Sequence, residues 1–130
     1  MSVGHVVDEM YASMSFEPGE RPDWAAQERV FDENARLVRV NDEGVFAFDP
    51  QTFRKNFEEL IESGKLPSFY EQEVDRQTHE FGDIAHVLSV YEMRTSRGGE
   101  LVARAVKSIQ LFKRNDRWII SAMLWRRQGR

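Results

Sequence analysis

The fold is decided by four segments in the second half of the chain: SFYEQEVDRQTHEF (68–81), DIAHVLSVYEMRTSR (83–97), ELVARAVKSIQLFKR (100–114) and RWIISAMLWRRQ (117–128). The dipeptides between them are Gly82-Asp83, Gly98-Gly99 and Asn115-Asp116, which accept the positive φ angles of two-residue hairpin turns. We therefore expect a four-stranded antiparallel meander. Strands this long, preceded by helices, predict a strongly bent sheet that wraps around a helix and leaves a cavity.

Helical segments are expected before the meander. Ser2 can cap a first helix, whose apolar residues recur at helical spacing through about residue 15. A second helix is expected over 23–31, with Asp23 as its cap. Pro18, Gly19 and Pro22 separate the two helices, because proline and glycine interrupt helical structure.

A short hairpin and a third helix complete the first half. The alternating segment ARLVRV (35–40) and its partner VFAF (45–48) flank turn residues. The pair Asp49-Pro50 then predicts the cap and first residue of a helix that ends at Gly64. The expected order is helix, helix, hairpin, helix and four-stranded meander.

Length and composition narrow the class of protein. The 130 residues are expected to form one domain, 1–130, and the absence of cysteine removes disulfides and thiolate metal sites. The net charge is −4, with an acidic first half and a mildly basic second half, which argues against a nucleic-acid-binding domain. The longest apolar run, Trp118 to Trp125, is too short to cross a bilayer. A cytoplasmic protein without a membrane partner is expected.

Several segments together resemble those of one superfamily. The matching stretches are MYASMS (10–15), DWAAQERVFDENARLVRV (23–40), FDPQTF (48–53), FGDIAHVLSVYEMR (81–94) and VKSIQLFKRNDRWIISAMLW (106–125). The chain resembles the nuclear transport factor 2-like superfamily, which shares a cystatin-like, cone-shaped α+β fold with ketosteroid isomerase, scytalone dehydratase and SnoaL-like polyketide cyclases. The resemblance covers essentially the whole chain and concerns scaffold segments, so it is specific for the fold rather than for an activity.

The resemblance leaves three functions open. One is a cofactor-independent isomerase, dehydratase or cyclase that acts on an apolar or carboxylic small molecule. The second is a non-catalytic protein that binds a ligand in the same pocket. The third is a dimerisation module.

The turn positions predict which side chains share a face of the meander. Two-residue turns pair Phe81 with Ile84, Arg97 with Glu100 and Arg114 with Arg117. On this register an aliphatic face, which we assign to the concave interior, contains Leu88, Val90, Ile109 and Leu124 among others. The opposite, convex face is expected to form a homodimer through Tyr91, Met93, Gln110, Met123 and Trp125.

Charged residues gather at one end of the predicted concave face and form the candidate catalytic site. Either Glu92 or Asp75 is expected to be the general base beside Lys107, with Tyr11 of the first helix as a hydrogen-bond donor. A first-helix tyrosine and a sheet carboxylate are familiar parts of the superfamily. The expected ligand-binding residues are Glu73, Leu88, Val90, Ile109 and Leu124. The alternative is a structural group of ion pairs at the mouth of the cone.

Two histidines on neighbouring strands are a second candidate site. His79 and His86 are predicted to lie directly opposite each other, where two imidazoles can bind a metal or relay a proton. The predicted neighbours supply no third ligand, so a structural role is favoured and no metal or cofactor is expected.

Overall fold

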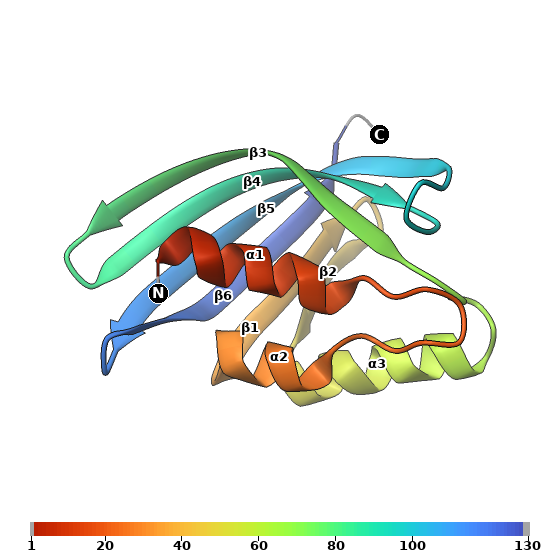
Figure 1. The fold of residues 1–130 in the computed structure, drawn as a ribbon, viewed down its shortest axis with the longest axis horizontal. Coiled ribbons are helices and arrows are strands. Elements are labelled where there is room, and N and C mark those ends of the chain that lie inside the picture. The colour runs from red at the N-terminus through yellow and green to blue at the C-terminus, as the bar shows by residue number, and fades with distance from the viewer. Residues whose placement is uncertain (1, 129–130) are drawn as a thin grey trace.

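The computed structural model describes residues 2–128 and places three helices on the concave face of one six-stranded sheet (Figure 1). The elements in chain order are α1 (Val3–Met14), α2 (Trp24–Val30), β1 (Phe31–Asn41), β2 (Gly44–Phe48), α3 (Pro50–Glu62), β3 (Tyr70–Phe81), β4 (Ile84–Arg94), β5 (Leu101–Arg114) and β6 (Arg117–Arg127). This arrangement confirms the predicted α+β fold with a curved sheet wrapped around helices.

The helices begin at the residues that the sequence predicts. Ser2 accepts a hydrogen bond from the backbone of His5, Asp23 from Ala26, and Asp49 from Thr52, at 3.0, 3.0 and 2.7 Å. Each bond satisfies one amide that has no partner within its own helix. These local contacts fix the start of each helix and hence which helical face meets the sheet.

The sheet has the strand order β2-β1-β6-β5-β4-β3. The N-terminal hairpin joins the meander because β1 runs parallel to β6, with Leu37 opposite Met123. Strand β1 begins directly after α2, so it is longer than the predicted 35–40. The edges of the open sheet are β2 and β3.

Helix α1 fills the centre of the concave face. In Figure 1 the strands β3 to β5 arch over this helix. Its side chains Val7 and Met10 are fully buried, as are Val87, Ile109 and Ile120 of the sheet. Burying an aliphatic side chain of this size stabilises the fold by about 1.5–3 kcal/mol. The core therefore lies between α1 and the sheet, and Phe53 of α3 belongs to the same cluster of buried residues.

The middle hairpin differs from its prediction, whereas the first and third hairpins are confirmed. Phe81 pairs with Ile84 and Arg114 with Arg117. Between β4 and β5, however, the chain leaves the sheet at Arg94 and returns at Leu101. Gly98 takes a φ of 72° in this longer connection. The predicted two-residue turn is therefore wrong.

The longer connection shifts the pairing of β4 with β5 by one residue. Lys107 lies opposite Ser89 instead of Val90. Because side chains alternate between faces, this shift exchanges the predicted faces of β3 and β4. Ala85, Val87, Ser89 and Tyr91 face the interior, whereas Ile84, His86, Leu88 and Val90 face outward.

Two irregularities move further residues between faces. The register shifts between Glu73 and Asp75 in β3, and again in β6 opposite Gln110 and Leu111. Met123 is consequently buried, and Leu124 is 42% exposed on the convex face. The predicted dimer-face residues Tyr91 and Met123 are therefore buried inside the cone, and Met93 and Trp125 also lie on its concave side, which corrects the sequence-based assignment.

Candidate functional site

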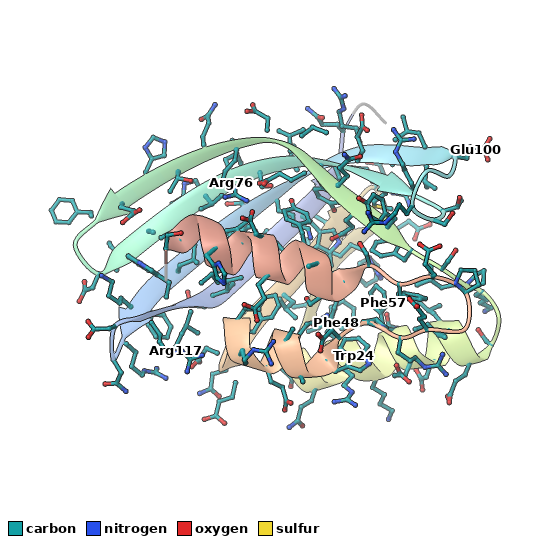
Figure 2. The ribbon with its side chains drawn as sticks, viewed as in Figure 1. Trp24, Phe48, Phe57, Arg76, Glu100 and Arg117 are labelled. Carbon is teal, nitrogen blue, oxygen red and sulfur yellow. The ribbon has the colours of Figure 1, made fainter. Side chains whose placement is uncertain are left out.

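A pocket of about 610 Å³ opens between α3, the β1–β2 turn and the concave face of the sheet. Its walls include aromatic residues of α3 and β6. Phe53 packs edge-on against Trp125, with ring centroids 5.9 Å apart, and its ring is tilted against that of Phe57 at 5.1 Å. Phe57 and Trp24, both labelled in Figure 2, meet edge-on with ring centroids 6.2 Å apart. The pocket is lined by apolar rings over much of its surface.

The rim of the pocket is charged. Arg39 lies over the rings of Phe46 and Phe48, at 5.0 and 5.7 Å from their centroids. Arg126 forms an ion pair with Asp42 of the β1–β2 turn at 2.8 Å. The pocket thus combines a charged rim with partly aromatic walls.

A buried ion pair lies at the inner end of the pocket. Lys107 Nζ is 2.7 Å from Glu71 Oε1, and the two side chains are 2% and 5% exposed. Both residues line the pocket. Glu71 Oε2 accepts no hydrogen bond within residues 2–128. Every fully buried polar side-chain atom of these residues has a partner, so Oε2 is not fully buried. This second oxygen is therefore reached from the pocket.

Aromatic rings surround the lysine on its other sides. Nζ lies 4.3 Å from the ring centroid of Tyr11 and 4.7 Å from that of Tyr91, and it contacts Met10 Sδ at 3.4 Å. The electron-rich faces of the two phenols favour the ammonium form. Burial nevertheless lowers the pKa of Lys107, and the attraction of Glu71 opposes this effect only in part.

A chain of hydrogen bonds leads from Tyr11 to the surface. Ser89 donates to Glu73 at 2.5 Å, and because a serine hydroxyl has one proton, the 2.6 Å bond between Tyr11 and Ser89 has the tyrosine as donor. Glu73 accepts two bonds from Arg76, which also contacts Asp8 of α1. The position of Arg76 above α1 is visible in Figure 2. This network fixes the phenol that flanks Lys107, and burial raises the pKa of Tyr11.

The predicted catalytic residues are only partly brought together. Lys107 lies in the pocket and Tyr11 contacts it, whereas Glu92 and Asp75 are on the outward-facing side of the sheet. Hydrogen bonds from Arg104 and Arg94 lower the pKa of Glu92, which is the opposite of what a general base near neutral pH requires. The one-residue shift between β4 and β5 explains this difference.

The predicted ligand-binding residues are also dispersed. Leu88 and Leu124 are 37% and 42% exposed on the convex face, where Val90 lies as well. Ile109 is completely buried in the core, and Glu73 belongs to the hydrogen-bond network. Within residues 2–128 none of these five side chains lines the pocket.

Sequence reasoning missed Glu71, although a signal for it existed. Lys107 alternates with Ala105, Ile109 and Leu111 along one face of its strand, a pattern typical of a buried lysine. A buried lysine requires a carboxylate partner. The partner lies on β3, two strands away, and the register error pointed to Glu92 and Asp75 instead.

The two histidines stack on the outer face of the sheet. The rings of His79 and His86 are 6.5 Å apart and nearly parallel, and His86 Nε2 is 3.3 Å from Ser108 Oγ. Within residues 2–128 no group of three or more His, Asp and Glu side chains is placed to hold a metal ion.

In the same residues no helix combines the length and apolarity needed to span a bilayer.

Comparison with solved structures identifies the fold. A protein of unknown function with a cystatin-like fold from Nostoc punctiforme superposes with a TM-score of 0.75 at 12% identity, over 98% of this chain and 89% of that protein. An NTF-2-like protein of unknown function from Silicibacter pomeroyi superposes with a TM-score of 0.63 at 18% identity, over 97% and 92%. The chain has the nuclear transport factor 2-like fold.

Enzymes are among the proteins that share the nuclear transport factor 2-like fold. The hexachlorocyclohexane dehydrochlorinase LinA-type3 from Novosphingobium barchaimii superposes with a TM-score of 0.69 at 11% identity, over 98% of this chain and 84% of that enzyme. No protein-family model matches the sequence, and no curated protein matches it at a significant level. These similarities establish the fold, while an activity has to be argued from the pocket itself.

Proposed function

We propose that the protein binds small, largely apolar molecules in its cone and transforms them by acid–base chemistry, as a cofactor-independent isomerase, dehydratase or cyclase does. The observation that carries this proposal is the position of Glu71. Its carboxylate is 5% exposed, holds Lys107 with one oxygen and presents the other to the pocket.

The geometry supports a division of roles between the two charged groups. Glu71 is the general base that takes a proton from a carbon or oxygen of the bound molecule through Oε2. Lys107 lies beside it and stabilises negative charge that develops on the substrate. Because both side chains are buried, such a fixed charge acts more strongly than it does in solution. A dehydrochlorinase with the same fold supports the view that this scaffold accommodates elimination chemistry.

Exchange of a carbon-bound proton tests this proposal directly. 2-Tetralone, an enolisable bicyclic ketone suited to an aromatic pocket, is dissolved in D₂O with the protein, and loss of its α-proton signal is followed by NMR. We expect the parent to accelerate exchange and Glu71→Gln to reduce this acceleration by about 10²–10⁴-fold, which is the usual contribution of a general base. Glu92→Gln is the matched control, because Glu92 is held by two arginines outside the pocket. Equal rates in the parent and in Glu71→Gln would contradict the assignment.

The same experiment separates catalysis from binding alone. A non-catalytic binding protein would show 2-tetralone-induced NMR shifts at Phe53 and Trp125, which line the pocket, without any acceleration of exchange. Shifts confined to the convex face, or none at all, would count against the pocket as a binding site.

A second candidate function rests on the convex face, which we propose to be a homodimer interface. Four apolar side chains form one row across four strands: Phe81, Ile84, Phe112 and Ile119. Phe81 and Ile84 are 84% and 58% exposed. A second copy of the chain presents the same row and can cover it symmetrically. This function is compatible with a ligand pocket on the opposite face.

A further inference from the structure

We propose that Lys107 is a nucleophile that condenses with the carbonyl carbon of an aldehyde or ketone in the pocket to form an imine. This inference rests on the proposed function, since it uses the same pocket and specifies the substrate class as carbonyl compounds.

The position of the amine supports this role. Lys107 is the only lysine of the described chain that lines the pocket, and its partner Glu71 lines the pocket as well. The rings of Tyr11 and Tyr91 and the sulfur of Met10 surround Nζ on other sides. A carbonyl compound that approaches from the pocket therefore meets Nζ and Glu71 together.

The contact between Nζ and Glu71 supplies the required proton transfers. Over a distance of 2.7 Å the ammonium can give its proton to Glu71, which converts two buried charges into a neutral pair. Removal of a lysine from water favours the neutral, nucleophilic amine. Burial also lowers the pKa of Lys107, in the direction that this transfer needs.

The reaction balances with these two residues and the substrate. The neutral amine attacks the carbonyl carbon, and the carbonyl oxygen takes up a proton from Glu71 as the carbinolamine forms. The amine nitrogen then loses a proton to the carboxylate, and Glu71 returns one to the hydroxyl group. Water leaves as the carbon–nitrogen double bond forms. No oxidant or reductant takes part in these steps.

Reductive trapping tests the inference on the unmodified protein. The parent is incubated with 2-naphthaldehyde and sodium cyanoborohydride, which reduces an imine to a stable secondary amine, and the labelled site is identified by peptide mass spectrometry. The chain has four lysines, and Lys55, Lys65 and Lys113 are exposed internal controls. We expect Lys107 to be labelled at least about tenfold faster than these three, because the pocket holds the aldehyde beside its amine, whereas the exposed lysines meet the aldehyde only from solution. Labelling of Lys107 no faster than the exposed lysines would overturn the inference.

A non-reactive analogue separates this inference from the proposed function. 2-Naphthalenemethanol has the same ring system and no carbonyl group, and its binding is followed through the indole NMR signal of Trp125. We expect it to bind and to slow the labelling of Lys107, but not that of Lys113. If the alcohol binds and Lys107 remains unlabelled, the imine is ruled out while the binding pocket stands. If the alcohol does not bind and Lys107 is not labelled, both proposals fail.

Discussion

Lys107 of β5 and Glu71 of β3 meet at 2.7 Å across the intervening strand β4, inside the cone. Neither side chain is more than 5% exposed. Two charges removed from water in this way stabilise the fold only if each compensates the other. The pair is a structural element and, in the function that we propose, the chemical centre of the pocket, and these two roles can be tested separately.

The stability of the protein should depend on the pair as a unit. We expect Lys107→Met to lower the free energy of unfolding by about 3–5 kcal/mol, because it leaves a buried carboxylate without its partner. The double variant Lys107→Met/Glu71→Met should lose less than the sum of the two single variants. Urea denaturation measures all three, and Glu92→Gln, in a partly exposed ion pair, should change stability by less than about 1 kcal/mol. Additive losses would show that the two residues are not coupled.

Lys107 should lose its proton at lower pH in the folded protein than in the unfolded chain. Burial lowers its folded-state pKa below the unfolded value of about 10.4, so between these two values the unfolded chain binds more protons. The destabilising effect of burying the charged lysine is fully present below the folded-state pKa and disappears as pH rises through this window. The contribution of Lys107 to the free energy of unfolding therefore rises with pH. Titration of the lysine Cε signals by NMR measures the folded pKa, with exposed Lys113 as the internal reference. A Lys107 midpoint at or above that of Lys113 would contradict the expectation.

The buried tyrosines should have the opposite effect at higher pH, where they should make the free energy of unfolding fall as pH rises. Burial raises the pKa values of Tyr11 and Tyr91, so above about pH 10 the unfolded chain loses phenolic protons that the folded chain keeps. Stability should therefore fall again above this pH. The effect of Lys107 on the free energy of unfolding is therefore best measured below about pH 10.

The hydrogen-bond chain from Tyr11 should respond unequally to deletion of its members. Ser89→Ala removes the acceptor of the Tyr11 hydroxyl and a donor to Glu73, and we expect a loss of about 1–3 kcal/mol. Tyr11→Phe removes one bond and should destabilise less. Because both changes affect the same contact, the double variant should be close to Ser89→Ala alone when measured by chemical denaturation. A Tyr11→Phe loss larger than that of Ser89→Ala would contradict this expectation.

Much of the fold could be predicted because its signals are local. The caps Ser2, Asp23 and Asp49 bond to amides three residues ahead, which sequence spacing alone reveals. The turn at Asn115 and Asp116 is also specified locally, since both residues take positive φ, at 51° and 61°. These features required no knowledge of distant parts of the chain.

The site could not be predicted in full because it depends on the pairing register between β4 and β5. Both faces of β4 are similarly apolar, with Val87 and Tyr91 on one side and Leu88 and Val90 on the other, so the pattern does not reveal which face is buried. The six residues 95–100 form a longer connection than Gly98-Gly99 implies. This difference of one pairing position moved Glu92 out of the site. Lys107 was predicted in the correct place because its own strand alternates clearly.

The oligomeric state should depend on the apolar row of the convex face. Ile84 is 58% exposed and lies between Phe81 and Phe112, so a charge there should disrupt an interface without disturbing the core. We expect sedimentation at micromolar concentration to give twice the chain mass for the parent and the monomer mass for Ile84→Glu. Val45→Glu is the matched control, because Val45 is 68% exposed on the edge strand β2 and should leave the dimer intact. A monomeric parent, or a dimeric Ile84→Glu, would contradict this interface. Retention of 2-naphthalenemethanol binding by monomeric Ile84→Glu would further show that each cone works independently of its partner.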